Sequence, residues 1–355
     1  MRPDRNFWRG KKVFVTGHTG FKGAWLCFWL HSMGARVTGV ALAPDNEPNL
    51  FNMLGLEKII SSRFLDIRNQ SLLAEAVKAS GADIVFHLAA QALVREGYKN
   101  PLSTFDTNFG GTANLLEALR GHAQVRVAVI VTTDKVYKNL ERRAPFVETD
   151  ELGGRDPYSA SKAAAELLVE SYRESYFRDQ GLAIATARAG NVIGGGDWSP
   201  ERLIPDCMKA WSAGQSVEIR MPDAVRPWQH VLDPLAGYLV LAQKLWDDPT
   251  LATSYNFGPD ADGSASVRDA VTLAQAKWNN GEARVKFGIE MNGPKESEIL
   301  RLSNARARTE LNFAPLWPLD TAIARTVDWY KNAKSGKSAL LLCANDIDVY
   351  ERGVL

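Results

Sequence analysis

Residues 13–25 read VFVTGHTGFKGAW, and this stretch decides the fold. A short apolar run is followed by glycines at three-residue spacing and then by an apolar helical pattern. Gly17 permits a tight turn, Gly20 lets the backbone approach a diphosphate, and Gly23 lets the helix pack closely on the strand. The start of that helix presents N–H groups and a positive dipole to an anion. The stretch therefore predicts a strand–turn–helix unit that binds the diphosphate of a dinucleotide.

The same alternation of strands and helices continues through the first half of the chain. Strands are predicted at residues 13–16, 36–40, 84–87, 127–132 and 183–187. Helices are predicted at residues 24–33, 71–80, 111–119 and 159–177. Near-continuous apolar strands separated by helices are typical of a parallel sheet covered on both faces. The sequence thus predicts an α/β fold with a Rossmann-like, doubly wound parallel sheet.

Glycine and proline become frequent after about residue 190, which predicts a smaller, loop-rich C-terminal lobe around a substrate. We expect a dinucleotide-binding domain over 8–190 and a substrate-binding lobe over 191–335, with the chain crossing between them. Residues 336–355 form a C-terminal tail, and no regular element is predicted from residue 331 onward.

Composition excludes several classes of partner. The 355 residues carry 42 Lys and Arg against 41 Asp and Glu, a net charge of +1, which argues against binding nucleic acid or anionic membranes by bulk charge. No apolar run approaches the roughly 18 residues that a membrane helix needs. The three cysteines are scattered and the five histidines lack ligand spacing, so we expect neither a disulfide framework nor a metal site. The polar, basic N-terminus shows no signal peptide, so we expect a cytoplasmic protein.

The segment DPYSASKAAAE at 156–166 places Tyr158 and Lys162 on one face of a predicted helix. A tyrosine with a pKa of about 10 is a poor base near neutral pH. A neighbouring ammonium and a positive nicotinamide both favour the phenolate. The phenolate can then accept a hydroxyl proton while a hydride leaves the same carbon for the cofactor. The alternative is an incidental YxxxK pattern on an amphipathic helix.

A second group of polar residues, TTDKVY at 132–137, follows the predicted strand 127–132. The carboxyl ends of parallel strands face the ligand crevice. Thr133 is therefore predicted to hydrogen-bond a substrate hydroxyl beside Tyr158. Asp134 and Lys135 add an acid and an amine, which indicates proton transfers beyond a simple oxidation. The alternative for these two residues is an ion pair on a surface loop.

Together these motifs resemble the extended short-chain dehydrogenase/reductase superfamily. Asp66-Ile67 is similar to its adenine-binding position, and HLAA at 87–90 to its strand-end motif against the cofactor. Asn108 is similar to an asparagine that braces the site. The resemblance implies the cofactor-binding residues Gly17, His18, Gly20, Phe21, Gly23, Asp66, Ile67, Leu88, Ala89, Ala90, Asn108, Tyr158 and Lys162.

The residues alone leave NAD and NADP open. An NAD site of this kind usually has an acidic residue at the end of the second strand. Here that strand runs into Ala41-Leu42-Ala43, and the next acid is Asp45. His18 and Lys22 lie in the glycine turn and could instead contact a 2′-phosphate. The resemblance favours NAD.

The Asp134-Lys135 pair resembles the nucleotide-sugar 4,6-dehydratases. The implied reaction oxidises the sugar at C4, eliminates water across C5–C6 and returns the hydride to C6. Asp134 would protonate the departing 6-hydroxyl, and position 135 would handle the C5 proton. Most of these enzymes have Asp-Glu here. An ammonium cannot accept a proton, so Lys135 must act as a neutral amine or stabilise the enolate while another group is the base.

Asp-Lys, with RAGNVIGGGDW at 188–198 and RPWQHVLDPLAGY at 226–238, resembles the branch of that family that acts on CDP-glucose. The implied product is a 4-dehydro-6-deoxy sugar, an early intermediate of deoxysugars in bacterial surface polysaccharides such as lipopolysaccharide O-antigen. The candidate substrate-binding residues are Gln91, Arg95, Asn191, Arg202, Arg226 and Asn256.

Other functions stay open. One is a nucleotide-sugar 4-epimerase, against which Asp134 argues because epimerisation needs no acid at C6. Another is a dehydratase of dTDP-glucose or GDP-mannose, and a third is a cofactor-sensing protein without catalysis. Helices 111–119 and 159–177 resemble the pair that forms a four-helix dimer interface, so we expect a homodimer or a dimer of dimers.

Overall fold

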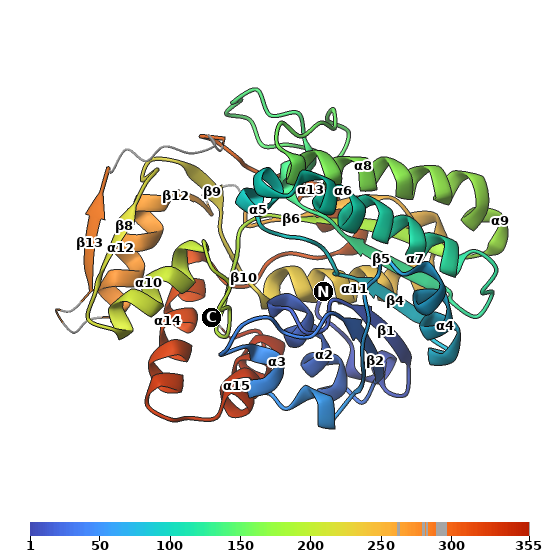
Figure 1. The fold of residues 1–355 in the computed structure, drawn as a ribbon, viewed down its shortest axis with the longest axis horizontal. Coiled ribbons are helices and arrows are strands. Elements are labelled where there is room, and N and C mark those ends of the chain that lie inside the picture. The colour runs from blue at the N-terminus through green and yellow to red at the C-terminus, as the bar shows by residue number, and fades with distance from the viewer. Residues whose placement is uncertain (261–262, 279–280, 282, 289–296, 355) are drawn as a thin grey trace.

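The centre of the computed structural model, which describes residues 1–260, 263–278, 281, 283–288 and 297–354, is a seven-stranded parallel sheet (Figure 1). All neighbouring strands in it pair in parallel. In spatial order the strands are β11 (Ser254–Phe257), β6 (Ala183–Ala189), β5 (Val127–Val131), β4 (Ile84–His87), β1 (Lys12–Thr16), β2 (Arg36–Ala41) and β3 (Ser61–Phe64). The predicted doubly wound parallel sheet is confirmed.

Alternate residues of each strand pack against helices on opposite faces of the sheet. Phe14 belongs to the hydrophobic cluster that includes the inner residues of α4 (Gln70–Ser80), α7 (Gly111–Leu119) and α8 (Pro157–Tyr172). Val13 and Val15 belong to the opposite cluster, with α2 (Phe21–Ser32) and α11 (Leu232–Asp247). Both faces of the sheet are therefore covered, which explains why its central strands are apolar throughout.

Two strands of the sheet were not predicted. β3 reads SSRF and lies at an edge, so it lacks the apolar run that marks a central strand. β11 lies within the predicted substrate lobe but pairs with β6 at the other edge. The chain therefore crosses back to the sheet after residue 250.

The remaining elements surround this core. Before residue 190 they are α1 (Arg5–Trp8), α3 (Leu50–Met53), η1 (Leu56–Lys58), α5 (Val94–Lys99), α6 (Pro101–Phe105), η2 (Asp106–Gly110), η3 (Asp134–Val136), η4 (Arg173–Phe177) and α9 (Arg178–Gln180). After it they are β7 (Val192–Ile193), α10 (Leu203–Ser212), β8 (Ser216–Ile219), β9 (Val225–Pro227), β10 (Gln229–His230), η5 (Pro249–Leu251), β12 (Ser264–Ser266), α12 (Val267–Trp278), β13 (Arg284–Phe287), α13 (Ala305–Leu311), α14 (Leu319–Lys334) and α15 (Ala339–Glu351). Three two-stranded sheets pair β7 with β10, β9 with β12 and β8 with β13. No helix within the described ranges combines the length and apolarity needed to cross a membrane.

The C-terminal segment is helical, which corrects the prediction of no element after residue 331. α15 packs on the core: the Tyr350 hydroxyl donates a hydrogen bond to Asp233 Oδ1 at 2.8 Å, and Trp29 Nε1 donates one to Glu351 Oε1 at 2.7 Å. Leu341 on the outer side is 66% exposed. Apolar residues therefore occupy both faces of α15, which hides the helical periodicity in the sequence.

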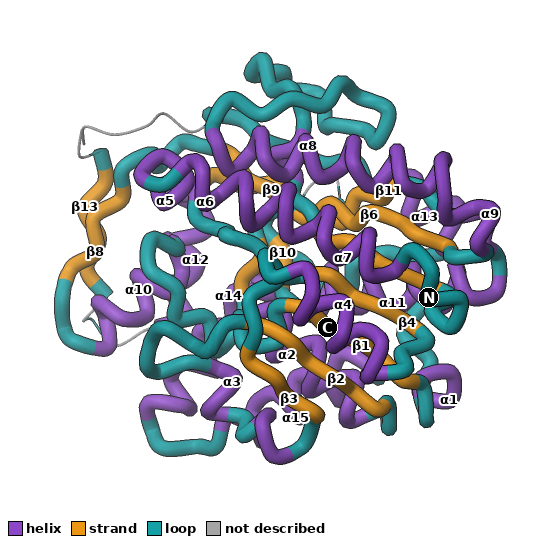
Figure 2. Tube along the Cα trace, turned by 45° about the vertical axis from the view of Figure 1, so that its right-hand side comes forward, coloured by secondary structure: helices purple, strands orange, loops and turns teal. Residues whose placement is uncertain are grey.

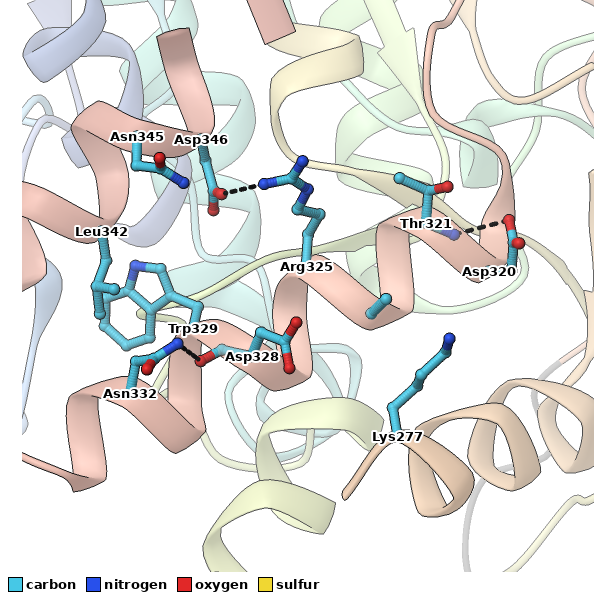
Figure 3. Close-up of a pocket in the computed structure, with 11 residues that line it drawn as sticks. Lys277, Asp320, Thr321, Arg325, Asp328, Trp329, Asn332, Leu342, Asn345 and Asp346 are labelled. Carbon is cyan, nitrogen blue, oxygen red and sulfur yellow. Dashed lines mark hydrogen bonds and ion pairs between the residues drawn. The ribbon is translucent and has the colours of Figure 1, made fainter. Parts of the chain in front are cut away.

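A polar pocket of about 430 Å³ lies between α12, α14 and α15 (Figure 3). Asp346 lines it, and its Oδ1 atom lies 3.5 Å from Arg325 Nη1. Burial raises the pKa of Asp346 to about 7, although Arg325 opposes this. Burial likewise raises the pKa of Asp233, beside Tyr350, to about 6. The packing of α14 and α15 thus involves two carboxyl groups that keep their protons to a higher pH than an exposed aspartate does.

These two groups predict that the protein loses stability as the pH rises from about 4 to about 6 for Asp233 and to about 7 for Asp346. An unfolded aspartate releases its proton near pH 4, whereas the folded ones keep it to higher pH, so folding binds protons in between. Their contribution is fully present below about pH 4 and is lost as the pH passes each folded pKa, at about 1.4 kcal/mol per pH unit and group. Urea unfolding of the wild type and of Asp346→Asn between about pH 5 and 8 tests this. The variant should show the shallower loss, and parallel curves would contradict the prediction.

Candidate active site

A cavity of about 1030 Å³ follows the carboxyl ends of β1, β4, β5 and β6 and continues to α10 and β8. Its walls come from the glycine turn, from the segments that follow each of these strands, and from the second lobe. This is the place where ligands bind in open α/β sheets. The cavity is also as large as the larger ligand pockets in proteins.

The glycine turn between β1 and α2 has the geometry that the sequence predicts. Gly17 has a φ of +79°, and a Cβ atom there would lie 2.6 Å from the backbone nitrogen of Ala89. A Cβ atom at Gly23 would lie 2.0 Å from the carbonyl oxygen of Gly17. Only glycine fits at either position. The closely packed turn leaves the N–H groups at the start of α2 at the cavity wall, where an anion can bind.

Eleven of the predicted cofactor residues line this cavity, and they are Gly17, Gly20, Phe21, Gly23, Asp66, Ile67, Leu88, Ala89, Ala90, Tyr158 and Lys162. His18 and Asn108 do not. The His18 ring packs under Gly39 of β2, and its Nε2 atom lies 2.7 Å from Ser62 Oγ. Burial lowers the pKa of His18 to about 4, so a neutral ring faces away from the ligand. This corrects the expectation that His18 contacts a cofactor or a 2′-phosphate.

Asn108 braces the site without lining it. Its side chain accepts a hydrogen bond from the Gln91 backbone N–H at 2.8 Å and donates to the Ser161 hydroxyl at 2.9 Å. The residue therefore joins the loop after β4 to the helix that carries Tyr158 and Lys162. Asn108 itself does not line the cavity, so its predicted contact with the cofactor stays a prediction.

Tyr158 and Thr133 meet in the cavity. Thr133 hydrogen-bonds the Tyr158 phenol, and its hydroxyl donates to Asp134 Oδ1 at 2.9 Å. Burial raises the pKa of Tyr158, while Thr133 and Arg202 oppose the rise. Lys162 does not bond the phenol, because its ammonium donates to the Val131 carbonyl at 2.9 Å. Burial is the largest influence on the Tyr158 pKa, and Lys162 is not among the groups that lower it in this structure.

Asp134 has the properties of a general acid. Its side chain is buried, and this burial raises the carboxyl pKa despite the nearby Lys135, Thr133 and Arg226. Its Oδ2 atom has no hydrogen-bond partner among the described residues. A Cβ atom at Gly190 would lie 3.2 Å from that oxygen, so glycine keeps the space beside it open. Lys135 lines the same cavity, and its backbone N–H donates to the Thr133 hydroxyl at 3.3 Å.

Four of the six predicted substrate residues line the cavity: Arg95, Asn191, Arg202 and Arg226. Arg226 is buried, and its Nη1 atom donates to the carbonyl oxygens of Val225 at 2.9 Å and Glu298 at 3.3 Å. These bonds hold one edge of the guanidinium against the cavity wall. A fixed guanidinium is well suited to a phosphate.

Gln91 and Asn256 are corrections to the predicted substrate contacts, since neither lines the cavity. The Gln91 amide donates to Thr104 Oγ1 at 2.9 Å, so it turns toward α6. Asn256 is fully buried, accepts a hydrogen bond from the Tyr137 hydroxyl at 2.6 Å and donates to the Phe146 carbonyl at 3.1 Å. The side-chain amides of both residues therefore form hydrogen bonds within the protein.

Sequence reasoning missed a buried ion pair, between Glu166 and Arg188, that contacts the segment 132–137. The Glu166 carboxylate accepts hydrogen bonds from Arg188 Nη2 at 2.8 Å, from Thr186 Oγ1 at 2.7 Å and from Thr132 Oγ1. Arg188 also donates to the Tyr137 hydroxyl at 2.9 Å. The pair therefore fixes both ends of the segment 132–137. No spacing in the sequence signals this pair, because Glu166 lies on α8 and Arg188 on β6.

Sequence reasoning also missed the apolar end of the cavity. It is lined by Val217, Ile219, Met221, Ala224, Trp228 and Val267. These residues come from β8, from the segments on either side of β9 and from the start of α12, which no motif joins in the sequence. In the described parts of the chain no group of three or more His, Cys, Asp or Glu side chains could hold a metal ion.

Comparison with known proteins agrees with this geometry. The family model described as GDP-mannose 4,6 dehydratase matches residues 14–326. The CDP-glucose 4,6-dehydratase of Salmonella typhimurium is 40% identical over 353 residues, which cover 98% of each chain. A dTDP-glucose 4,6-dehydratase of Xanthomonas campestris pv. campestris is 28% identical and covers 89% of this chain and 92% of the relative.

Solved structures share the fold over most of the chain. A UDP-glucose-4-epimerase from Stenotrophomonas maltophila with bound NAD has a TM-score of 0.79 and 25% identity, covering 92% of this chain and 100% of that one. The dTDP-glucose 4,6-dehydratase of Bacillus anthracis in complex with NAD has a TM-score of 0.76 and 21% identity, covering 93% and 100%. The match of the family model to most of the sequence, on this fold and with this cavity, places the chain in the GDP-mannose 4,6 dehydratase family.

Proposed function

We propose that the protein is an NAD-dependent CDP-glucose 4,6-dehydratase, a lyase that forms CDP-4-dehydro-6-deoxyglucose and water. One observation carries the proposal: a single cavity holds Tyr158 and Thr133 beside a buried Asp134 with a raised pKa and a partner-free oxygen. An epimerase needs the tyrosine and threonine but has no use for this acid. The 40% identical relative named CDP-glucose 4,6-dehydratase supports the choice of nucleotide.

The residues present fit a bound NAD. The glycine turn would hold its diphosphate, and the segments 65–68 and 88–90 would enclose the adenosine and nicotinamide ends. The neutral His18 supplies no cation for a 2′-phosphate. NAD is present in the solved epimerase and dehydratase structures that share this fold. When bound, NAD⁺ would supply the hydride acceptor for C4 and the hydride donor for C6.

Tyr158 and Thr133 serve the oxidation at C4. Tyr158 accepts the proton of the 4-hydroxyl, and a bound NAD⁺ would take the hydride that leaves C4. Thr133 orients that hydroxyl, and the positive charge of an oxidised nicotinamide favours the phenolate against the effect of burial. The resulting ketone acidifies the hydrogen on C5.

Asp134 and Lys135 serve the elimination that follows. The C5–H bond breaks, its proton passes to the amine of Lys135 or to another base, and the C6–O bond breaks as Asp134 donates its proton. A bound reduced cofactor would then supply the hydride to C6, and the protonated base returns its proton to C5. The sum is the loss of one water, with the cofactor regenerated. Arg226, Arg202 and Asn191 would bind the substrate diphosphate, and the apolar end of the cavity would take the nucleobase.

The test is incubation of the purified protein and NAD⁺ with CDP-glucose and, in parallel, with dTDP-glucose, UDP-glucose and GDP-mannose. Mass spectrometry should find a product lighter by one water from CDP-glucose at a far higher rate than from the others. Equal rates of water loss from all four nucleotide sugars would contradict the proposed preference for the CDP sugar. A product of unchanged mass would replace the dehydratase by an epimerase, and no turnover of any sugar would refute an enzymatic function.

We propose further that the protein forms a homodimer through α6, η2 and α8, with pairing of dimers into tetramers as a second step. α6, η2 and α7 follow one another as one helical stretch, which lies beside α8 (Figure 2). Together with η4, which continues α8, they expose large apolar side chains, namely Leu102, Phe105, Phe109, Leu167 and Tyr176. Leu102 is 85% exposed and Leu167 57%. Exposed apolar side chains grouped in this way mark interfaces between proteins.

Replacing Leu102 and Leu167 together by aspartate should therefore convert the dimer to a monomer, because the charges would be buried without partners. Sedimentation velocity measures the change. The control is Leu341→Asp, which adds a charge at an exposed position on α15 and should leave the dimer intact. A double variant that sediments like the wild type would move the interface elsewhere.

We also propose a reducing, cytoplasmic location. Cys27, Cys207 and Cys343 are buried free thiols, which supports this proposal. Detection of the tagged protein in the cytoplasmic fraction of its host would test it, and a periplasmic signal would refute it.

A further inference from the structure

Tyr137 ends the segment that carries residues 133–135, and its hydroxyl joins this segment to β6 and β11. The hydroxyl accepts a hydrogen bond from Arg188 Nη1 on β6 at 2.9 Å and donates one to Asn256 Oδ1 on β11 at 2.6 Å. Its ring stacks on that of Phe146, with centroids 4.8 Å apart and planes 7° from parallel. The side chain is buried and does not line the cavity. The mechanism derived above therefore gives Tyr137 no direct part.

Thr132 attaches the other end of the same segment. Its hydroxyl donates to Glu166 on α8, and its backbone N–H donates to the Ala187 carbonyl on β6 at 2.9 Å. Glu166 and Arg188 form an ion pair with an oxygen–nitrogen distance of 2.8 Å, and their side chains are at most 4% exposed. One buried ion pair therefore reaches both ends of the segment, through Thr132 at the first end and through Tyr137 at the second.

The catalytic acid lies between these two attachments. Asp134 Oδ1 accepts a hydrogen bond at 2.9 Å from the hydroxyl of Thr133, its neighbour in the segment. Asp134 Oδ2, which has no hydrogen-bond partner among the described residues, lacks such support. Thr133 differs, because it also bonds the Tyr158 phenol on α8. A catalytic group must be held within about 0.5 Å of its productive place, so the placement of Oδ2 depends on how the ends of the segment are held.

We propose that Tyr137 is a positioning residue for the elimination of water: fixed by the buried ion pair, it holds the free oxygen of Asp134 in place for the 6-hydroxyl of the substrate. The inference rests on the proposed function, because an acid here matters only if water is lost. Thr133 keeps its bond to Tyr158 when the Tyr137 hydroxyl is removed, so oxidation at C4 should continue. Proton transfer to the departing hydroxyl should suffer, since a misplacement of about 1 Å can cost about 10²-fold in rate.

Tyr137→Phe tests the proposal, because it removes one oxygen and keeps the ring that stacks on Phe146. With NAD⁺ and CDP-glucose, the purified variant should lose water about 10- to 10²-fold more slowly than the wild type, with little change in KM. Reduced cofactor and a 4-keto sugar that keeps its 6-hydroxyl should accumulate. The absorbance of reduced nicotinamide and mass spectrometry of the sugar measure both. A loss of stability alone would not produce this sugar, because the molecules that remain folded would complete the reaction.

Two variants separate this role from packing. Tyr255→Phe removes a neighbouring buried phenol of β11 that bonds the Leu251 carbonyl and Glu310, so it should react at the wild-type rate without the keto sugar. Thr132→Val removes the hydroxyl at the other end, beside Thr133, so it should slow the oxidation itself and accumulate no keto sugar.

The outcomes distinguish this inference from the proposed function. Water loss at the wild-type rate in Tyr137→Phe, or slower loss without any keto sugar, would overturn the positioning role and leave the dehydratase function intact. The same fall in rate in Tyr255→Phe would also overturn it, because general loosening would then explain the effect. A wild type that removes water from no nucleotide sugar would refute the proposed function, and this inference with it.

Discussion

Replacing Tyr158 by phenylalanine should lower the rate of CDP-glucose dehydration by about 10²–10⁴-fold while leaving NAD⁺ affinity within a few-fold of the wild type. The ring would still fill its buried position, so the cavity and the Thr133 side chain stay in place. What is lost is the oxygen that accepts the proton of the 4-hydroxyl. Without it no ketone forms, and every later step is blocked. Steady-state kinetics and calorimetric titration with NAD⁺ measure the two quantities.

The matched control is Tyr255→Phe. This removes another buried phenol, which bonds the Leu251 carbonyl and Glu310 at the far edge of the sheet. It should reduce the free energy of unfolding by about 0.5–1.5 kcal/mol and leave the turnover number unchanged. A Tyr158→Phe variant that keeps a tenth or more of the wild-type rate would show that another group, such as Thr133 with water, takes the proton.

The parts of the fold that could be predicted are those whose burial shows in a short stretch of the sequence as a continuous apolar run. The strands β1, β4 and β5 carry continuous apolar runs because both of their faces are buried, and β4 and α7 have the predicted bounds. β3 and β11 were not predicted, because an edge strand needs no apolar run and its pairing depends on a strand distant in the chain. α15 was not predicted because apolar residues occupy both of its faces and its side-chain hydrogen bonds to α2 and α11 join segments more than 90 residues apart.

The candidate site divides in the same way. Residues whose position follows from the backbone, such as the glycines of the turn and the residues after β5, line the cavity as predicted. His18, Gln91 and Asn256 lie beside the correct loops, but their side chains turn inward to partners on other elements. Spacing along the chain does not determine which way a loop side chain turns. The Glu166–Arg188 pair joins α8 to β6, so only the assembled fold shows that it holds the catalytic segment.

Replacing Asp134 by asparagine should separate the oxidation from the elimination. Asparagine keeps the shape and an oxygen that accepts the Thr133 hydrogen bond, so Tyr158 and Thr133 can still oxidise C4. It cannot give an acidic proton to the departing 6-hydroxyl, so water loss should fall by about 10²–10⁴-fold. The variant should therefore accumulate reduced cofactor and a 4-keto sugar that still carries its 6-hydroxyl. The absorbance of reduced nicotinamide and mass spectrometry of the released sugar measure both.

Lys135→Met provides the matched comparison, because it alters the neighbouring residue of the same segment. In deuterated water, Asp134→Asn should incorporate deuterium at C5 of the keto sugar, since the base is intact and the ketone is present. Lys135→Met should form the ketone without that exchange if Lys135 is the base. Exchange at the wild-type rate in Lys135→Met would assign the C5 proton to another group. An Asp134→Asn variant that eliminates water at the wild-type rate would remove the acid from the mechanism, and with it the feature that distinguishes this cavity from that of an epimerase.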